Sequence, residues 1–242
     1  MNVHISRIDI TKILFLDIET VPQYATYDEV PEVERELWEQ KSKRLRSDDM
    51  SEEDLYKKAG IFAEFGKIIC ISVAYVLQKK DDIQVRVRSF SGHDEKQVLL
   101  DFMELIRKHF DGKQTLFCAH NGIEFDFPYL ARRALINGIT IPRSLDTRGK
   151  KPWETPYIDT LDLWRFGDYK NYTSLKLLTH IFAIPTPKDD IDGSMVCDVY
   201  WRENDLQRIV TYCQKDVIAI LQLFRRYRCE ELILDDAVVI VE

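Results

Sequence analysis

The sequence predicts an α/β fold in which a mixed β-sheet is flanked by helices. Three observations lead to this prediction: short apolar segments typical of strands, longer segments with helical spacing, and their order along the chain. That order is three strands, helix, strand, helix, strand and further helices. The chain has 242 residues, enough for one sizeable domain. We therefore expect residues 1–242 to form a single domain.

The first three strands are predicted in the N-terminal half. Residues 13–18 are apolar with little alternation, which is typical of a central strand buried on both faces. Residues 67–77 are rich in β-branched side chains, and residues 83–90 alternate as expected for an edge or half-exposed strand. Residues 79–82 are predicted to form the hairpin turn between them. The charged segment at about 30–60 has helical composition, and we interpret it as a helical insertion.

The remaining elements alternate between helices and short strands. Helical spacing predicts a first helix at 94–110, and Gly138 is expected to end a second one. The last strand is predicted after a loop. The segments in order are the helix 94–110, strand 115–119, helix 128–137, loop 146–156, strand 157–160, helix 173–182, loop 185–195 and helix 205–228.

Composition favours a soluble globular protein. Apolar residues make up 45% and charged residues 31%, and no apolar run approaches the roughly 20 residues of a membrane span. The N-terminus lacks the basic head and apolar core of a signal peptide, so we expect a cytoplasmic protein. The net charge of -7 is unfavourable for a module that binds polyanions through charge alone. A metal-dependent nuclease remains compatible with it, because bound cations change the local charge.

The five cysteines are interpreted as reduced core residues. Their number is odd, no pair has the C-x-x-C spacing, and several lie within apolar runs. They are Cys70, Cys118, Cys197, Cys213 and Cys229.

Asp17 and Glu19 form an acidic pair at the end of the first predicted strand. Side chains alternate along a strand, so both acids share a face with the apolar Ile13 and Phe15. Burying two carboxylates without a partner is costly, and a divalent cation would offset that cost. The alternative is a strand that reaches the surface and ends in polar residues.

Asp126 follows a predicted strand and opens a helix, with aromatic residues on both sides. This position suits a cleft. The alternative is that Asp126 is the helix N-cap, a role that Asp often fills. Pro128 in the first helical turn fits both interpretations, and Asp126 by itself favours the cap.

The final helix carries Tyr212 and Asp216, which are four residues apart and share one face. Both fall at the edge of the apolar stripe of this helix, where a cleft would lie. Asn204 and the following Gln207 are predicted to form a capping box at its start. The alternative is that Tyr212 lies at the boundary of the core and Asp216 is solvated. The spacing alone is a weak signal, because it also occurs between Tyr24 and Asp28.

Taken in order, these acids and Tyr212 resemble the DEDD superfamily of 3'-5' exonucleases, which has an RNase H-like fold. The tyrosine variant, DEDDy, matches, whereas the histidine variant would have His at the position of Thr211. The resemblance covers about residues 13–228 and is strongest to the proofreading exonuclease domain of family B DNA polymerases and to stand-alone polymerase-B-like exonucleases. It rests on the segments Phe-Leu-Asp-Ile-Glu-Thr, Asn-Gly-x-x-Phe-Asp-Phe-Pro-Tyr-Leu and Tyr-Cys-x-Lys-Asp-Val.

The resemblance implies a metal-dependent 3'-5' exonuclease in which Asp17, Glu19, Asp126 and Asp216 bind two Mg²⁺ or Mn²⁺ ions. Oxygen ligands suit these hard cations. The two ions would activate water and stabilise the leaving 3' oxygen, and Tyr212 would orient the water. The expected substrate is single-stranded nucleic acid, with DNA favoured over RNA, and the expected products are nucleoside 5'-monophosphates.

Four residues are predicted to contact the substrate: Thr20, Asn121, Phe125 and Lys176. Thr20 and Asn121 lie beside the acids, and Phe125 or Phe127 could stack on a base. Lys176 lies in a Ser-Leu-Lys segment that resembles an element contacting single-stranded DNA in related domains. The alternative for Phe125 and Phe127 is that they belong to the core. The alternative for Lys176 is that it is a surface lysine without a binding role.

Other interpretations remain open. The leading alternative is a catalytically silent nucleic-acid-binding or scaffold protein on the same fold, and a second is an endonuclease or resolvase. The complete set of acids favours catalysis. Asp159 and Asp162 add acids without an assigned role. The basic runs 41–46, 148–151 and 225–228 could guide a strand. We expect no polymerase domain within 242 residues, and therefore no proofreading in cis.

Overall fold

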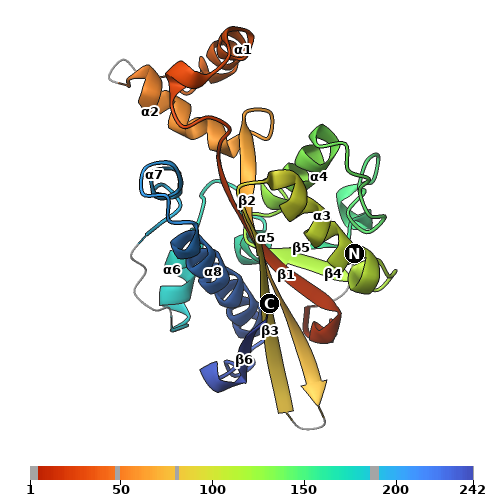
Figure 1. Ribbon diagram of the computed structural model, residues 1–242. Helices are drawn as coiled ribbons and strands as arrows, with labels where there is room; N and C mark the ends of the chain where they lie inside the picture. The colour runs from red at the N-terminus through yellow and green to blue at the C-terminus, as the bar shows by residue number, and fades with distance from the viewer. Residues whose placement is uncertain (1–4, 47–49, 80–81, 186–190, 242) are drawn as a thin grey trace.

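A six-stranded mixed sheet forms the centre of the computed structural model, which describes residues 5–46, 50–79, 82–185 and 191–241 (Figure 1). The strand order is β5-β4-β1-β2-β3-β6. β2 pairs antiparallel with both β1 and β3. β4 runs parallel to β1, β5 parallel to β4, and β6 parallel to β3. The strands are β1 (Ile13–Pro22), β2 (Gly66–Lys79), β3 (Asp82–Ser91), β4 (Leu116–Ala119), β5 (Tyr157–Asp159) and β6 (Val238–Val241).

Helices cover both faces of the mixed sheet, which confirms the predicted α/β class. The long helix α8 packs on one face, and α3 and α4 pack on the other (Figure 1). The helices are α1 (Glu32–Ser42), α2 (Glu52–Lys57), α3 (Glu95–Leu105), α4 (Asp126–Ile136), α5 (Thr160–Arg165), α6 (Leu175–Ile181), α7 (Val196–Trp201) and α8 (Leu206–Tyr227).

β1 is buried on both faces, as its apolar sequence predicts. Leu14 and Leu16 belong to the core shared with α3 and α4, whereas Ile13 and Phe15 belong to the core beneath α8. The ring of Phe15 packs edge-on against Phe224 of α8, with the ring centroids 5.6 Å apart. Alternation along the strand therefore directs the odd-numbered residues that follow Phe15 toward α8.

β1 runs beyond the end of its neighbour β4. The two strands pair only from Ile13 to Phe15 on β1, and the register against β2 shifts between Glu19 and Thr20. Such irregularities re-aim side chains and are common beside functional sites. The second half of β1 thus has β2 on one side and, on the other, the segment that follows β4.

Several elements differ from the prediction. β3 is half-exposed but is not an edge strand, because β6 pairs with it. The predicted helix 94–110 is α3 followed by a wider, π-helical turn at Ile106–Phe110. Asp205 rather than Asn204 caps α8, and the backbone of Asn204 has a positive φ of 55°. α5, α7 and β6 were not predicted, because four to six residues are too few to show a clear period.

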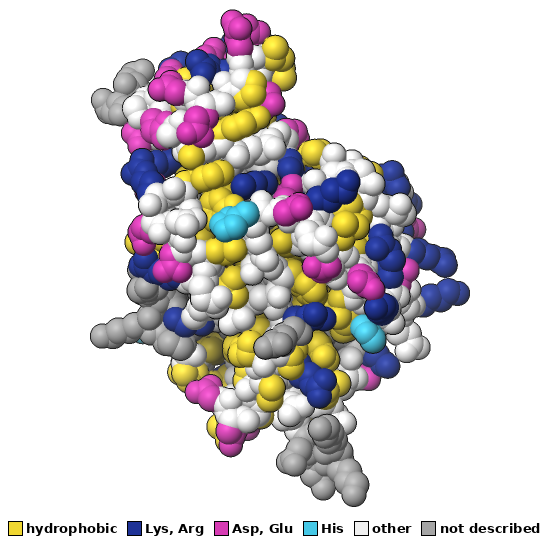
Figure 2. All heavy atoms as spheres, viewed as in Figure 1, with side chains coloured by type: hydrophobic (Ala, Val, Ile, Leu, Met, Phe, Trp, Pro, Cys, Tyr) yellow, Lys and Arg dark blue, Asp and Glu magenta, His cyan; other side chains and the backbone are white. Residues whose placement is uncertain are grey.

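The segment between β1 and β2 contains α1, α2 and a short 3₁₀ turn (Lys58–Ile61), and we refer to residues 23–65 as the helical arm. The arm projects from one end of the sheet (Figure 1). It has its own core around the fully buried Trp38, which packs on Tyr56, Phe62 and Phe65. On the face shown in Figure 2, Asp and Glu side chains gather over this arm.

Three of the five cysteines lie in the core as predicted. Cys70, Cys118 and Cys213 are buried, but Cys197 is half-buried and Cys229 is exposed, so the predicted core placement is wrong for these two.

Residues 80–81 of the predicted hairpin turn and 186–190 of the last predicted loop lie outside the described residues. Within the described chain, no helix has both the length and the apolar character needed to cross a membrane.

A buried ion pair joins α3, α4, β2 and the helical arm. The carboxylate of Glu95 accepts hydrogen bonds from the Ile68 N–H (2.7 Å) and from Arg133 Nε (2.8 Å) and Nη2 (2.5 Å). Asn137 Nδ2 donates a further bond to it at 2.8 Å. Arg133 Nη1 in turn donates to the carbonyl of Ala63 in the arm at 2.9 Å. The network therefore fixes α4, which carries Asp126, relative to the sheet.

Replacing Glu95 by Ala is expected to destabilise the protein strongly. The substitution leaves the guanidinium of Arg133 buried without its anion, a change that costs about 3–5 kcal/mol. Urea unfolding measures the loss. The control is Glu104→Ala, which breaks an exposed pair (2.6 Å) between Glu104 of α3 and Lys108 of the following π-helical turn and should leave the free energy of unfolding close to wild type. Equal effects of the two substitutions would contradict the role of the network.

Candidate active site

Asp17 and Glu19 lie on the second half of β1 and face α8, as the alternation predicts. Glu19 is only 8% exposed and Asp17 is half-buried. The candidate ligand oxygens of the two carboxylates lie within 4.8 Å of each other. Two acids in such proximity and burial need a positive partner or protonation.

Asp126 is the first residue of α4 and is only 4% exposed. Phe125 takes the N-cap position, so the alternative interpretation of Asp126 as the N-cap is wrong. Burial raises the pKa of the Asp126 carboxyl to about 7, with Asp159 adding to the effect. Hydrogen bonds from backbone N–H groups, including that of Ile18, oppose the shift. The contact with Ile18 places Asp126 beside the part of β1 that extends beyond β4.

Tyr212 and Asp216 lie one turn apart on α8, and both are half-buried. The Tyr212 hydroxyl is hydrogen-bonded to the carboxyl group of Asp216. Burial, followed by the negative charges of Asp216, Glu19 and Asp17, raises the pKa of Tyr212 far above its usual value. The hydroxyl therefore stays protonated and acts as a hydrogen-bond donor.

The four acids act on one another electrostatically. Burial raises the pKa of Asp17 well above its usual value, and the charges of Glu19, Asp216 and Asp126 raise it further. The pKa of Glu19 is also raised well above its usual value, by burial first and then by charges that include Asp216 and Asp126. We refer to Asp17, Glu19, Asp126 and Asp216 as the acid cluster. Its donor set consists entirely of carboxylate oxygens, which fits a hard divalent cation.

Cys213 of α8 is a neighbour of the acid cluster, whereas the sequence predicted only that it is a reduced core cysteine. Its thiol donates to Asp17 Oδ2 at 3.3 Å, and it is close enough to Asp17 and Glu19 to form a geometric ligand group with them. Burial raises the pKa of this thiol well above its usual value, so it stays protonated. A protonated, soft sulfur is a poor ligand for Mg²⁺. Cys213 therefore orients Asp17 as a hydrogen-bond donor.

Asp159 holds the turn that leads into Asp126, a role that the sequence did not reveal. Its carboxylate accepts the N–H groups of Asn121 (2.8 Å), Ile123 (3.0 Å) and Leu161 (2.9 Å). The turn also needs Gly122, because a Cβ there would lie 2.4 Å from the Cβ of Ala119. Asn121 adopts a positive φ of 60°, which Asn tolerates better than most residues.

His120 connects the end of β4 to the segment before α6. Its Nε2 lies 3.0 Å from the carbonyl of Thr173, so this nitrogen carries the proton, and Nδ1 accepts from the Thr160 hydroxyl at 2.9 Å. Burial lowers the pKa of His120 to about 4, and the nearby charge of Arg165 also lowers it, although the bond to Thr173 opposes the shift. The imidazole is therefore neutral and positions the 171–173 segment beside the acid cluster.

The residues predicted to contact the substrate differ in how deeply the structure buries them. Thr20 is half-buried on β1 and is hydrogen-bonded to Tyr129. Phe125 is half-buried and packs on Tyr129, whereas Phe127 is buried and stacks on Tyr157, with centroids 3.9 Å apart. Phe127 therefore belongs to the core, and the idea that it stacks on a base is wrong.

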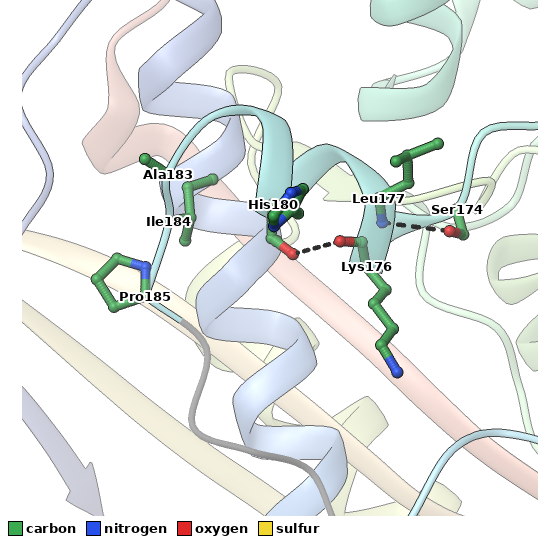
Figure 3. Close-up of a pocket in the computed structure, with 8 residues that line it drawn as sticks. Ser174, Lys176, Leu177, His180, Ala183, Ile184 and Pro185 are labelled. Atoms are coloured by element: carbon green, nitrogen blue, oxygen red, sulfur yellow. Dashed lines mark hydrogen bonds between the residues drawn. The ribbon is translucent and has the colours of Figure 1, made fainter.

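Lys176 lies in the wall of a hollow along α6 (Figure 3). Ser174 caps this helix by accepting from the Leu177 N–H at 3.3 Å, and the side chain of Lys176 extends away from that cap (Figure 3). The charge of Lys176 also acts on Asp192. No residue of the acid cluster is among those that line the hollow.

Two of the basic runs lie far from the acids. The run 148–151 precedes β5, so it lies at the opposite end of the parallel strands from Asp126. The run 225–228 ends α8, about 14 Å along the helix from Asp216, and its Arg225 and Arg228 pair with Glu230 (3.2 and 2.7 Å). These two runs are not placed to guide a strand at the acid cluster.

Comparison with known proteins defines the class of this protein as a nuclease-type α/β domain. A family described as "Predicted 3'-5' exonuclease related to the exonuclease domain of PolB" matches residues 61–238. The match covers more than half of the sequence, and the chain belongs to this family.

Solved structures resemble the chain only distantly. The family B DNA polymerase from the hyperthermophilic archaeon Pyrobaculum calidifontis is 15% identical, with a TM-score of 0.49 over 89% of this chain and 27% of that one. The RNase domain of the yeast Pop2 protein is 11% identical, with a TM-score of 0.36 over 87% of this chain and 79% of that one. The chain thus spans about a quarter of the polymerase. No curated protein sequence matches it.

His120 should make stability fall as the pH is lowered. Its folded-state pKa of about 4 lies below the value of 6.5 expected when unfolded, so the unfolded chain binds the extra proton first. Stability from this group is present above pH 6.5 and is lost toward pH 4. Between pH 7 and pH 5, wild type should lose on the order of 2 kcal/mol that His120→Gln does not lose.

Urea unfolding at the two pH values measures this difference. His109→Gln, at an exposed position after α3, is the matched control and should keep the wild-type pH dependence. An identical pH dependence in wild type and His120→Gln would show that His120 is not held neutral by the fold.

Proposed function

We propose that this protein is a metal-dependent 3'-5' exonuclease acting on single-stranded nucleic acid, with DNA favoured over RNA. The observation that carries the proposal is the acid cluster: four carboxylates from β1, α4 and α8, in which the charges of Asp126 and Asp216 raise the pKa of both Asp17 and Glu19. Membership of the PolB-related exonuclease family supports it. We further propose that residues 1–242 act as one domain, with the helical arm as an insertion.

The acid cluster is proposed to hold two divalent cations, Mg²⁺ or Mn²⁺. When bound, such ions lower the pKa of a coordinated water and stabilise the charge that develops on the leaving 3' oxygen. The chain's own part is to present oxygen ligands in a fixed arrangement. Asp17 is oriented by the thiol of Cys213, and Asp126 by the turn that Asp159 holds. Hydrolysis at the 3' end would release nucleoside 5'-monophosphates.

Tyr212 is proposed to orient the attacking water. A phenol with an ordinary pKa of about 10 is a weak base near pH 7, so its useful role is to hold the water by a hydrogen bond. Its position one helical turn from Asp216, with the two side chains hydrogen-bonded, supports this role. Thr20, Asn121 and Phe125 are proposed as contacts to the terminal nucleotide, and Lys176 as a more distant contact to the strand.

Removing a cluster acid should abolish nuclease activity while the fold persists. With a 5'-labelled single-stranded DNA and Mg²⁺ or Mn²⁺, wild type should shorten the strand stepwise from its 3' end, and EDTA should stop the reaction. Asp17→Ala and Asp216→Ala should each lower kcat/KM by roughly 10³-fold or more.

Asp101→Ala is the matched control. Asp101 is an exposed acid on α3 whose carboxylate accepts from Gln97 Nε2 at 2.8 Å, so its loss should leave the rate within a few-fold of wild type. A protein that leaves both DNA and RNA intact would instead support the alternative of a silent binding or scaffold protein. Internal cuts in place of a 3' ladder would support an endonuclease.

Tyr212→Phe should lower kcat by about 10²-fold with little change in KM, because the ring remains while the hydroxyl loses its contacts to the water and to Asp216. Steady-state kinetics on the same DNA separates the two parameters. Tyr24→Phe is the control, since Tyr24 precedes Asp28 with the same spacing but lies in the helical arm, where its hydroxyl donates to Glu34 at 3.4 Å. A rate for Tyr212→Phe equal to that of Tyr24→Phe would exclude the proposed role.

A further inference from the structure

Three aromatic side chains are exposed within seven residues after α5. Phe166 is 93% exposed, Tyr169 71% and Tyr172 64%. We refer to residues 166–172 as the aromatic loop. Aromatic side chains supply much of the free energy of burial in protein cores, so three exposed rings in one short loop indicate a surface for binding.

The aromatic loop borders the acid cluster at both of its ends. It starts at the end of α5, where Arg165 lies 3.7 Å from Glu124 in the turn before Asp126. It finishes at Thr173, whose carbonyl accepts the hydrogen bond from His120. The ring of Tyr172 also packs edge-on against His120, with centroids 6.3 Å apart. The negative charges of Asp126 and Asp216 act on the Tyr172 hydroxyl, so this ring lies within electrostatic range of the site.

The backbone keeps these rings in the solvent. Phe166 has a positive φ of 45°, and Gly167 follows with a φ of 89°. A positive φ is unfavourable for a bulky residue, and such strain is often found at functional sites. Tyr169 lies against the guanidinium of Arg165, 5.4 Å from its ring centroid, and Arg165 is fixed by Asp162 at 2.7 Å.

We propose that the aromatic loop stacks on the bases of the substrate strand immediately upstream of the 3' nucleotide. Every base has a flat π-face, so aromatic rings bind single strands with little sequence preference. The exposed Lys170 adds positive charge for the phosphates between the bases. The continuity of the loop with the acid cluster favours a nucleic acid strand as the occupant over a protein partner. The inference rests on the proposed exonuclease function and deepens it.

The test compares three substrates that share the same reaction. The first is a single-stranded oligodeoxynucleotide, the second is the same strand with abasic sites at the three positions before its 3' nucleotide, and the third is the p-nitrophenyl ester of thymidine 5'-monophosphate. The double variant Phe166→Asn/Tyr169→Ala removes two rings, and Asn suits the left-handed backbone at position 166. Its kcat/KM should fall about tenfold on the intact strand and stay unchanged on the abasic strand and the ester.

A single variant serves as the control. Trp153→Ala removes another exposed ring, 62% exposed, from the loop at the opposite end of β5, and it should act on all three substrates as wild type does. Equal losses on the ester and on the intact strand would overturn the stacking role, because the ester has no upstream base.

A binding measurement keeps the inference separate from the proposed function. With Ca²⁺ in place of Mg²⁺, fluorescence anisotropy of the labelled intact strand gives Kd without turnover, and the double variant should bind about tenfold more weakly. An unchanged Kd, or a changed oligomeric state in sedimentation, would overturn the inference even in an active enzyme. Failure of wild type to cleave the ester and the strands would overturn the exonuclease function, while base-dependent binding would still support the stacking loop.

Discussion

Mutual repulsion among four half-buried or buried carboxylates is the constraint on which the rest of the site depends. Asp17, Glu19, Asp126 and Asp216 come from three separate elements, and the charges of Asp126 and Asp216 raise the cost of ionising Asp17 and Glu19. Such an arrangement does not stabilise the fold by itself, because desolvation and the repulsion between like charges both disfavour the ionised carboxylates. The stability needed to hold the acids together has to come from elsewhere in the molecule.

The surrounding contacts supply that stability. β1 is anchored between two cores before it reaches the acids, so Asp17 and Glu19 are carried on a strand that cannot move outward. The Glu95–Arg133 pair fixes the helix that carries Asp126, and Asp159 fixes the turn in front of it. These contacts satisfy buried polar groups with full sets of hydrogen bonds, and such networks rigidify the structure around them.

Only part of the acid cluster was accessible through local signals, because Asp126 by itself favoured a helix cap and joined the cluster through the resemblance of the ordered set of acids to the exonuclease family. Alternation placed Asp17 and Glu19 on one face of a buried strand, and helical spacing placed Tyr212 beside Asp216. The positioning residues were not predicted, because their roles arise from contacts between distant segments. Asp159 bonds to backbone 36–38 residues earlier, and Cys213 meets Asp17 across 196 residues. The N-cap expectation for Asp126 failed because tertiary burial of that side chain overrode the usual capping preference.

The net negative charge of the protein is unfavourable for binding its proposed substrate, which is a polyanion. A net charge of -7, with acidic side chains gathered over the helical arm, opposes binding through phosphate contacts alone. Two of the three basic runs lie away from the acid cluster, so they do not correct this imbalance locally. Two divalent cations would neutralise the four carboxylates of the acid cluster beside the scissile phosphate, and stacking on uncharged rings would hold the strand beyond it. The two contributions act on different parts of a nucleotide, so strand binding in such an acidic protein should depend less on salt than binding through many lysine contacts does.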